Sequence, residues 1–183
     1  FVIQNFGPLR LGIVGATDPM KIYESIFHLH PQKPEKVLPS LIQQVRGRGA
    51  QTILLLSHLG LKEDRRVAEI ISGIDVIVGG HTHDALNPPL KINGTVIAQA
   101  GDYGRFLGRL DLEIDPVSGR VTHFEGTLLP VDDSIPPDAE ADGDPERDAE
   151  QPDLDAEQQR PDRDPRRGQA ERHPDAHLPA LRL

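Results

Sequence analysis

The pattern of hydrophobic and polar positions alternates short aliphatic runs with longer segments of helical periodicity. Residues 9–14, 52–56 and 74–78 are aliphatic runs with the length of buried strands. Hydrophobic residues recur at helical spacing over 37–45 and 62–72, and glycines follow both segments. Because strands that alternate with helices favour crossover connections, the pattern predicts a largely parallel sheet and an α/β fold.

Beyond residue 84 the pattern changes to pairs of strands joined by short turns. Residues 90–92 and 96–98 flank an Asn-Gly-Thr turn at 93–95, whose Asn-Gly step suits a tight turn with positive φ. Residues 107–114 and 121–128 flank a second turn that contains proline and glycine. We therefore predict two antiparallel hairpins after the parallel part of the sheet.

Charge divides the chain into two parts. Residues 1–131 carry 13 acidic and 13 basic side chains, whereas residues 132–183 carry 16 acidic and 7 basic ones. The second part has no aromatic residue and no valine, so it buries too little apolar surface to offset the entropy of ordering its backbone. We predict a folded domain over 1–131 and a disordered, acidic, proline-rich tail over 132–183, which is either a natural linker or translated frameshifted sequence.

Composition excludes some classes of function. The chain has no cysteine, which excludes disulfides and thiolate chemistry. No hydrophobic stretch approaches the roughly 20 residues of a membrane span, and neither nucleic acid nor a membrane is expected as a partner. The chain begins with Phe1 rather than with methionine or a signal peptide, so we expect a fragment from the middle of a longer protein.

Three histidines follow two of the predicted strands. His58 comes directly after the run 52–56, and the sequence Gly-Gly-His-Thr-His at 79–83 places His81 and His83 after the run 74–78. A single histidine at the end of a strand is usually structural. Neighbouring parallel strands, however, bring their ends to one edge of a sheet, and neutral imidazole is the commonest protein ligand for divalent metals. The pattern therefore predicts a metal site.

The remaining histidines are interpreted as incidental. His28 and His30 lie in a polar loop, His123 lies on a predicted strand, and His173 and His177 lie in the tail.

Other residues near the histidine loop allow two interpretations each. Asp75 and Asp84 either orient an imidazole or have a solvated or turn-forming role, and the second alternative is favoured. Tyr103 and Gly104 either line the rim of the site or, for the tyrosine ring, pack in the core.

One block of sequence resembles a known family. Ser-His-Leu-Gly at 57–60, the run Gly-Ile-Asp-Val-Ile-Val-Gly-Gly-His-Thr-His at 73–83, Ala-Gln-Ala-Gly-Asp-Tyr-Gly at 98–104 and Leu-Gly at 107–108 occur in this order. They resemble the second half of the catalytic domain of the 5′-nucleotidase group of calcineurin-like metallophosphoesterases. The resemblance covers residues 9–131. It implies the second half of an αββα sandwich, with a mixed sheet, flanking helices and terminal hairpins.

The resemblance also implies a cofactor and ligands. The family holds two divalent ions, which in this chain would be Mn, Zn, Mg, Fe or Ca. By position, His58 and His81 resemble ligands of the second metal and His83 resembles a ligand of the first. The family's Asp-x-His motif, bridging aspartate and Asn-His-(Glu/Asp) segment are not found, so no catalytic residue is identified. The missing N-terminal half of the domain is expected to be required for activity, and the isolated chain is expected to be inactive.

Two functions follow from this interpretation. The first is part of a phosphohydrolase, periplasmic or extracellular as the resemblance implies, which hydrolyses phosphate esters of nucleotides or related small molecules by metal-activated water. The second is a non-catalytic metal-binding or interaction fragment that lacks half of the active site. The family motifs named above, if found upstream of Phe1, would favour the first.

Overall fold

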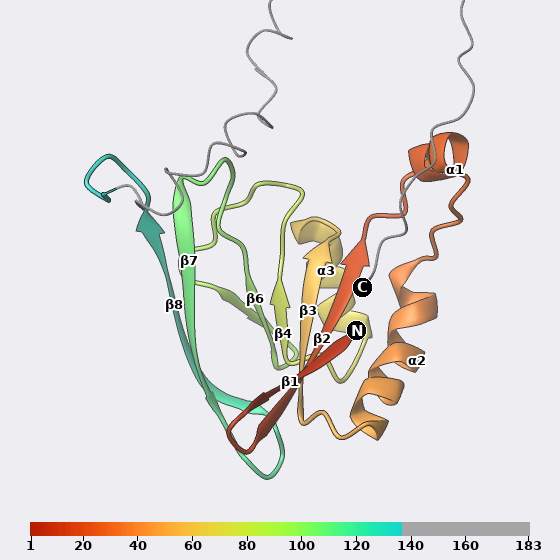
Figure 1. The fold of residues 1–183 in the computed structure, drawn as a ribbon, viewed down its shortest axis with the longest axis horizontal. Coiled ribbons are helices and arrows are strands. Elements are labelled where there is room, and N and C mark those ends of the chain that lie inside the picture. The colour runs from red at the N-terminus through yellow and green to blue at the C-terminus, as the bar shows by residue number, and fades with distance from the viewer. Residues whose placement is uncertain (137–183) are drawn as a thin grey trace, which may run out of the picture. The chain divides into compact units, whose positions relative to one another are not determined.

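The structure, a computed structural model, describes residues 1–136. These residues form one six-stranded sheet and one separate hairpin (Figure 1). The spatial order of the six strands is β1 (Val2–Phe6), β2 (Leu9–Thr17), β3 (Thr52–His58), β4 (Val76–Val78), β6 (Thr95–Ala98) and β5 (Leu90–Ile92).

The centre of the sheet is parallel, as the sequence pattern predicts. Strands β2, β3, β4 and β6 run in the same direction, and the two outer strands β1 and β5 pair antiparallel with their neighbours. In this register Thr17 pairs with His58, and Leu56 pairs with Val78. The carboxyl ends of β2, β3 and β4 therefore meet at one edge of the sheet, where the histidines lie.

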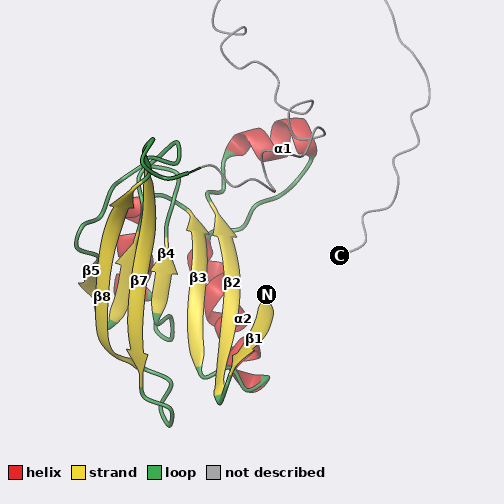
Figure 2. Ribbon diagram, turned by 60° about the vertical axis from the view of Figure 1, so that its left-hand side comes forward, coloured by secondary structure: helices red, strands yellow, loops and turns green. Residues whose placement is uncertain are grey.

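Two helices cover one face of the sheet, α2 (Pro34–Gly47) and α3 (Leu61–Ile70) (Figure 2). Leu38, Ile42 and Val45 of α2 are buried because residues three and four apart share one side of a helix. Val67 and Ala68 of α3 are likewise buried against the sheet. Each large aliphatic side chain buried in this way contributes about 1.5–3 kcal/mol, which fixes both helices on the sheet.

The hairpin of β7 (Phe106–Ile114) and β8 (Val121–Pro130) lies on the opposite face (Figures 1 and 2). The Thr52 hydroxyl donates a 2.7 Å hydrogen bond to the Gly119 carbonyl and so ties the turn of the hairpin to β3. Part of this face is not covered within the described residues: Leu56 is 50% exposed and Val78 is 38% exposed.

The predicted helices and strands over 9–128 are confirmed, with shifted ends. Strand β2 continues through 15–17, beyond the predicted run 9–14, and β3 continues through Ser57 and His58, because both segments pair with a neighbouring strand. The sequence pattern gave no warning of β1 or of the short helix α1 (Lys21–Phe27). Both lack a clear hydrophobic period, since most of their side chains are exposed.

Two further expectations concern the ends of the fold and membranes. Residues 1–135 form one compact unit, and the predicted tail lies, from residue 137 onward, outside the described residues. No helix in the described part of the chain is both long and apolar enough to cross a membrane.

Candidate metal centre

The imidazoles of His58 and His81 face each other at the carboxyl edge of the sheet. His58 is the last residue of β3, and His81 lies in the loop that follows β4. Nδ1 of His81 is 3.3 Å from Nε2 of His58, and the two rings meet edge to face with centroids 4.9 Å apart. Two of the three predicted imidazoles are thus brought together by the neighbouring strands.

His83 has different neighbours. Its Nδ1 is 3.6 Å from a carboxylate oxygen of Asp102, and its ring meets the edge of Tyr103 with centroids 5.6 Å apart. Arg105 donates from Nε to the same carboxylate at 2.8 Å and holds it in place. His81 and His83 therefore contact different groups, although they are only two residues apart.

The loop that carries these histidines has an unusual backbone. His81 and His83 have φ values of 73° and 59°, in the left-handed region that side chains with a Cβ rarely adopt. Each such residue costs about 1–2 kcal/mol, so the loop keeps this shape only because surrounding contacts impose it.

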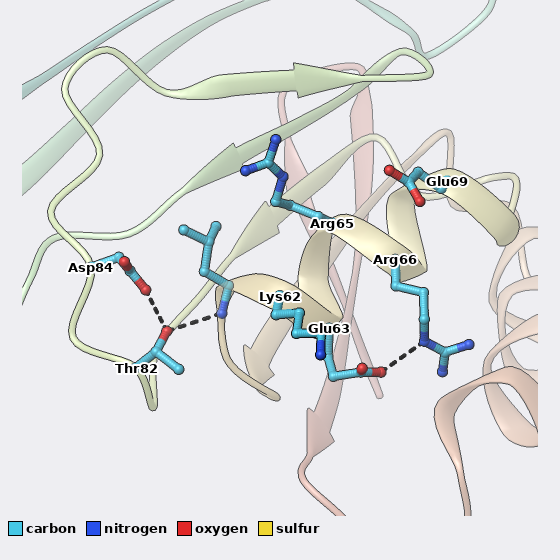
Figure 3. A pocket seen from close by; sticks show the side chains of 8 residues that line it. Lys62, Glu63, Arg65, Arg66, Glu69, Thr82 and Asp84 are labelled. Carbon is cyan, nitrogen blue, oxygen red and sulfur yellow. Dashed lines mark hydrogen bonds and ion pairs between the residues drawn. The ribbon is translucent and has the colours of Figure 1, made fainter.

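One of those contacts ties the histidine loop to helix α3. The Thr82 hydroxyl accepts a 3.0 Å bond from the backbone N–H of Leu61 and donates a 2.5 Å bond to Asp84 (Figure 3). Leu61 is the first residue of α3, whose first N–H groups have no partner within the helix. Thr82 therefore caps the helix and anchors the loop at once.

Figure 3 also shows an open depression beside this loop. Most of its lining is charged and comes from one side of α3. None of the three histidines contributes to it, so it adjoins the candidate metal centre without containing it. Its lining residues are Leu61, Lys62, Glu63, Arg65, Arg66, Glu69, Thr82 and Asp84.

A buried carboxyl lies beneath the histidines. Asp64 of α3 is fully buried, and one of its oxygens accepts a hydrogen bond from the Ser57 hydroxyl, which in turn accepts a 3.2 Å bond from the N–H of Leu59. Burial raises the pKa of Asp64 above its usual value, and the hydrogen bond from Ser57 opposes that rise. Its other oxygen has no hydrogen-bond partner within residues 1–136.

Sequence reasoning did not single out Asp64, which lies within the predicted helical segment 62–72. A signal was present, because Asp64 shares the helical face of Val67, Ala68 and Ile71, all of which are buried. A carboxylate on an apolar helix face points into the core, where its burial costs free energy unless hydrogen bonds compensate for the lost water.

The expectations for the flanking residues have mixed outcomes. Both interpretations of Asp75 are wrong: its carboxylate lies at the amino end of β4, where it accepts bonds from the Ile53 N–H at 2.7 Å and from Arg46 at 2.9 Å. The Asp84 carboxylate accepts the Thr82 hydroxyl, and no bond joins it to an imidazole within residues 1–136. Tyr103 is 89% exposed, so core packing of its ring is wrong, and it lies at the rim beside His83.

His28 is the C-cap residue of α1, and two other described histidines pair with exposed acids. His30 lies 3.4 Å from Glu24, and His123 lies 3.6 Å from Glu125. His173 and His177 lie outside the described residues.

The geometry of His58 and His81 fits two ligands of one ion. With metal–nitrogen bonds of about 2.0–2.1 Å in a tetrahedral arrangement, the two ligand nitrogens lie about 3.3–3.4 Å apart. The observed separation is 3.3 Å. Within residues 1–136, no group of three or more histidine, cysteine, aspartate or glutamate side chains converges as a complete metal site. The described residues therefore fit part of a coordination shell.

Comparison with known proteins gives relatives of one kind, although no family model matches the chain. An uncharacterised metallophosphoesterase of Bacillus subtilis, YunD, is 33% identical over 110 residues, which cover 60% of this chain and 23% of the relative. The mouse 5′-nucleotidase is 27% identical over 161 residues, covering 75% of this chain and 27% of the relative. The solved structure of the Thermus thermophilus sulfate thiohydrolase SoxB superposes with a TM-score of 0.68 and 31% identity, over 76% of this chain and 26% of that one.

Fold and relatives together show that the chain is related to the metallophosphoesterases. Within them its relation is to the 5′-nucleotidase family, as the sequence resemblance indicates. The six-stranded mixed sheet with its helices matches the 5′-nucleotidase and SoxB structures. The chain spans about a quarter of the length of the Bacillus and mouse relatives.

Proposed function

We propose that this chain supplies part of the metal centre of a dinuclear phosphohydrolase of the 5′-nucleotidase type. His58 and His81 bind one divalent ion, and His83 binds the other. The observation that carries the proposal is the 3.3 Å separation of the His58 and His81 nitrogens. Two neutral imidazoles at this distance either share a single proton or direct both lone pairs at one cation, and the second arrangement suits the relatives of the chain.

The chemistry that such a centre supplies, when loaded, is activation of water and polarisation of the phosphoryl oxygens of a small phosphate ester. The chain's own residues hold the ligands in place. Asp102, itself held by Arg105, faces Nδ1 of His83, and this contact favours the tautomer whose Nε2 lone pair is free to bind a metal. The exposed ring of Tyr103 forms a rim beside this histidine, where it offers an aromatic surface to a nucleotide base.

We further propose that a second sheet packs on the uncovered face of the described one and completes an αββα sandwich. Leu56 and Val78 lie on that face, and a shallow hollow there extends from residues 15–17 to His58 and Gly80. Because this exposed aliphatic surface ends at a candidate metal ligand, we infer that a further element covers it and contributes additional ligands. The Asp-x-His and Asn-His-(Glu/Asp) motifs of the family are the groups that such an element would carry.

The decisive experiment measures phosphate release from a nucleoside monophosphate with Mn²⁺ or Zn²⁺. The chain is assayed alone and together with a polypeptide that carries the first half of the catalytic domain. We expect no turnover by the chain alone and turnover by the combination. The His81→Ala variant should abolish that turnover, and the His123→Ala variant, which removes an exposed imidazole paired with Glu125, should retain it.

Two outcomes would contradict the proposal. Turnover that is insensitive to His81→Ala would place the chemistry elsewhere. A stable complex that binds metal through His58 and His81 but releases no phosphate from any nucleotide would favour the alternative function, a non-catalytic metal-binding module.

A further inference from the structure

The two histidine loops are connected by buried polar side chains that no metal ligand assignment includes. We propose that Gln99 and Asp64 are positioning residues, which hold the His58 loop and the His81–His83 loop at ligand spacing before any metal binds. The inference rests on the proposed function only in taking these histidines as ligands. The contacts themselves belong to the metal-free chain.

Gln99 holds the loop that carries His83. It lies just after β6, and its side chain is 3% exposed. With its amide oriented so that the oxygen meets donors, that oxygen accepts the backbone N–H groups of His83 at 3.0 Å and Asp84 at 2.9 Å. These bonds fix the peptide on both sides of a residue with a φ of 59°, so they oppose the relaxation that this backbone would otherwise undergo.

Asp64 holds the loop that carries His58. Its buried carboxyl accepts the Ser57 hydroxyl, which also receives the N–H of Leu59. The residues on both sides of His58 are thus tied to one carboxyl on α3. Since β3 ends at His58, this contact sets the direction in which the chain leaves the strand.

The two halves of the network approach each other at Gly79. A Cβ built at this glycine would lie 2.5 Å from Oδ2 of Asp64 and 3.2 Å from the end of the Gln99 amide that faces only acceptors. In the orientation above this end is the NH₂ group. The carboxyl that supports one loop and the amide that supports the other therefore flank the same glycine, directly before Gly80 and His81.

In this proposal the histidines bind the metal, and the buried polar residues only hold the loops that carry them. The spacing of the histidine loops is set by Asp64 and Gln99, whose side chains are buried in the fold and are not metal ligands in this proposal. Partners behind metal ligands typically change metal affinity by 10–100-fold when they are removed.

The test uses the full chain, free of metal, and measures backbone amide hydrogen exchange by NMR. Gln99→Met keeps the length of the side chain and removes the acceptor. The matched control is Thr95→Val at the start of β6, the strand that Gln99 follows, which removes a buried 2.8 Å bond to the Ile74 carbonyl. We expect exchange at His83 and Asp84 to accelerate about tenfold or more in Gln99→Met and to stay unchanged in Thr95→Val.

A second, smaller substitution tests the other half of the network. Ser57→Ala removes only the hydroxyl between Asp64 and Leu59, and we expect faster exchange at the Leu59 amide with His83 and Asp84 unaffected. Zn²⁺ titration of the same variants should give about tenfold weaker affinity for Gln99→Met and Ser57→Ala than for Thr95→Val.

The outcomes separate this inference from the proposed function. Unchanged exchange at His83 and Asp84 in Gln99→Met would overturn the inference, whatever the metal does. Accelerated exchange with unchanged Zn²⁺ affinity would overturn the positioning role for the metal. Accelerated exchange in a chain that binds no Zn²⁺ at all would support the loop contacts and overturn the proposed function instead.

Discussion

Nε2 of His58 and Nδ1 of His81 lie 3.3 Å apart, although 23 residues separate them in the sequence. The contact exists because β3 and β4 are parallel neighbours, so that the end of one strand and the loop after the other meet at the same edge of the sheet. Within residues 1–136, neither imidazole forms an ion pair with an acidic side chain. The pair is therefore the part of the candidate site that metal binding should test first.

His58→Ala and His81→Ala should each weaken the binding of Zn²⁺ by at least about tenfold, since each variant leaves a single imidazole at this position. The measurement is isothermal titration calorimetry on the full chain. His123→Ala is the control, because this exposed imidazole lies on β8, 3.6 Å from Glu125, and is not part of the His58–His81 pair. Equal affinity in all four proteins would exclude the pair as a metal site.

His83→Ala should behave differently from the other two variants. Its imidazole faces Asp102 and Tyr103 and not the His58–His81 pair, so the first ion should still bind with near wild-type affinity. We expect titration of the unaltered protein with excess Mn²⁺ or Zn²⁺ to show a second, separate binding event, and we expect His83→Ala to lose it. If His83→Ala weakens the first event as much as His81→Ala does, the assignment of the two histidines to different ions is wrong.

The sequence predicted the edge of the sheet at which the histidines lie, because that edge follows from hydrophobic runs and crossover connections. The hydrophobic pattern did not indicate which imidazoles meet; only the family resemblance did, because it assigned His58 and His81 to the same metal. Their meeting depends on the left-handed φ values of His81 and His83, which arise from contacts with Thr82 and with the strands behind the loop. Such contacts join residues about 20 positions apart, so the local periodicity of hydrophobic residues does not predict them.

The burial of Asp75 was the other feature that the sequence pattern did not predict. Asp75 was interpreted from its place beside the histidine loop in sequence, but it precedes β4, whereas the histidines follow it. A strand of only three residues was enough to place the carboxylate at the far end, where it bonds to Arg46 and Ile53. Proximity in sequence is a poor guide to proximity in space across a strand.

Asp75→Ala should destabilise the fold by about 2 kcal/mol, because it leaves the Ile53 N–H without its acceptor and removes the carboxylate that pairs with the Arg46 guanidinium in a half-buried setting. Urea denaturation followed by circular dichroism measures the change. Asp111→Ala is the control, since Asp111 forms an exposed ion pair with Arg109 and its loss should cost less than about 1 kcal/mol. Equal costs in the two variants would show that Asp75 carries no special structural role.

Asp64 should make stability depend on pH. Burial raises the pKa of its carboxyl above the value of 3.8 that applies in the unfolded chain. The folded state then binds a proton more readily, so the contribution of this group to stability is fully present below pH 3.8 and is lost as the pH rises through the folded-state pKa.

Asp64→Asn removes this titration while keeping an oxygen that accepts the Ser57 hydroxyl. The stability of the variant relative to the unaltered protein should therefore increase from about pH 4 upward and level off above the folded-state pKa. Urea denaturation at a series of pH values between 3 and 8 measures the difference. A difference that is constant across this range would mean that Asp64 titrates normally in the folded chain.

Gly79→Ala should damage both the fold and the candidate metal centre, because the position has no room for a methyl group. The added Cβ would lie 2.5 Å from Oδ2 of Asp64, whose carboxyl is buried and held by Ser57, so it cannot move aside as an exposed side chain would. Overpacking of this kind typically costs about 1–3 kcal/mol. The displaced loop should also carry His81 away from His58, and Zn²⁺ affinity should fall together with stability.

Gly15→Ala is the matched control, since Gly15 lies in β2 with no atom within 4 Å of the added Cβ. Thermal denaturation and Zn²⁺ titration of both variants give the answer: a Gly79→Ala protein as stable and as tightly metal-binding as Gly15→Ala would show that the carboxyl of Asp64 does not lie against the loop that presents His81.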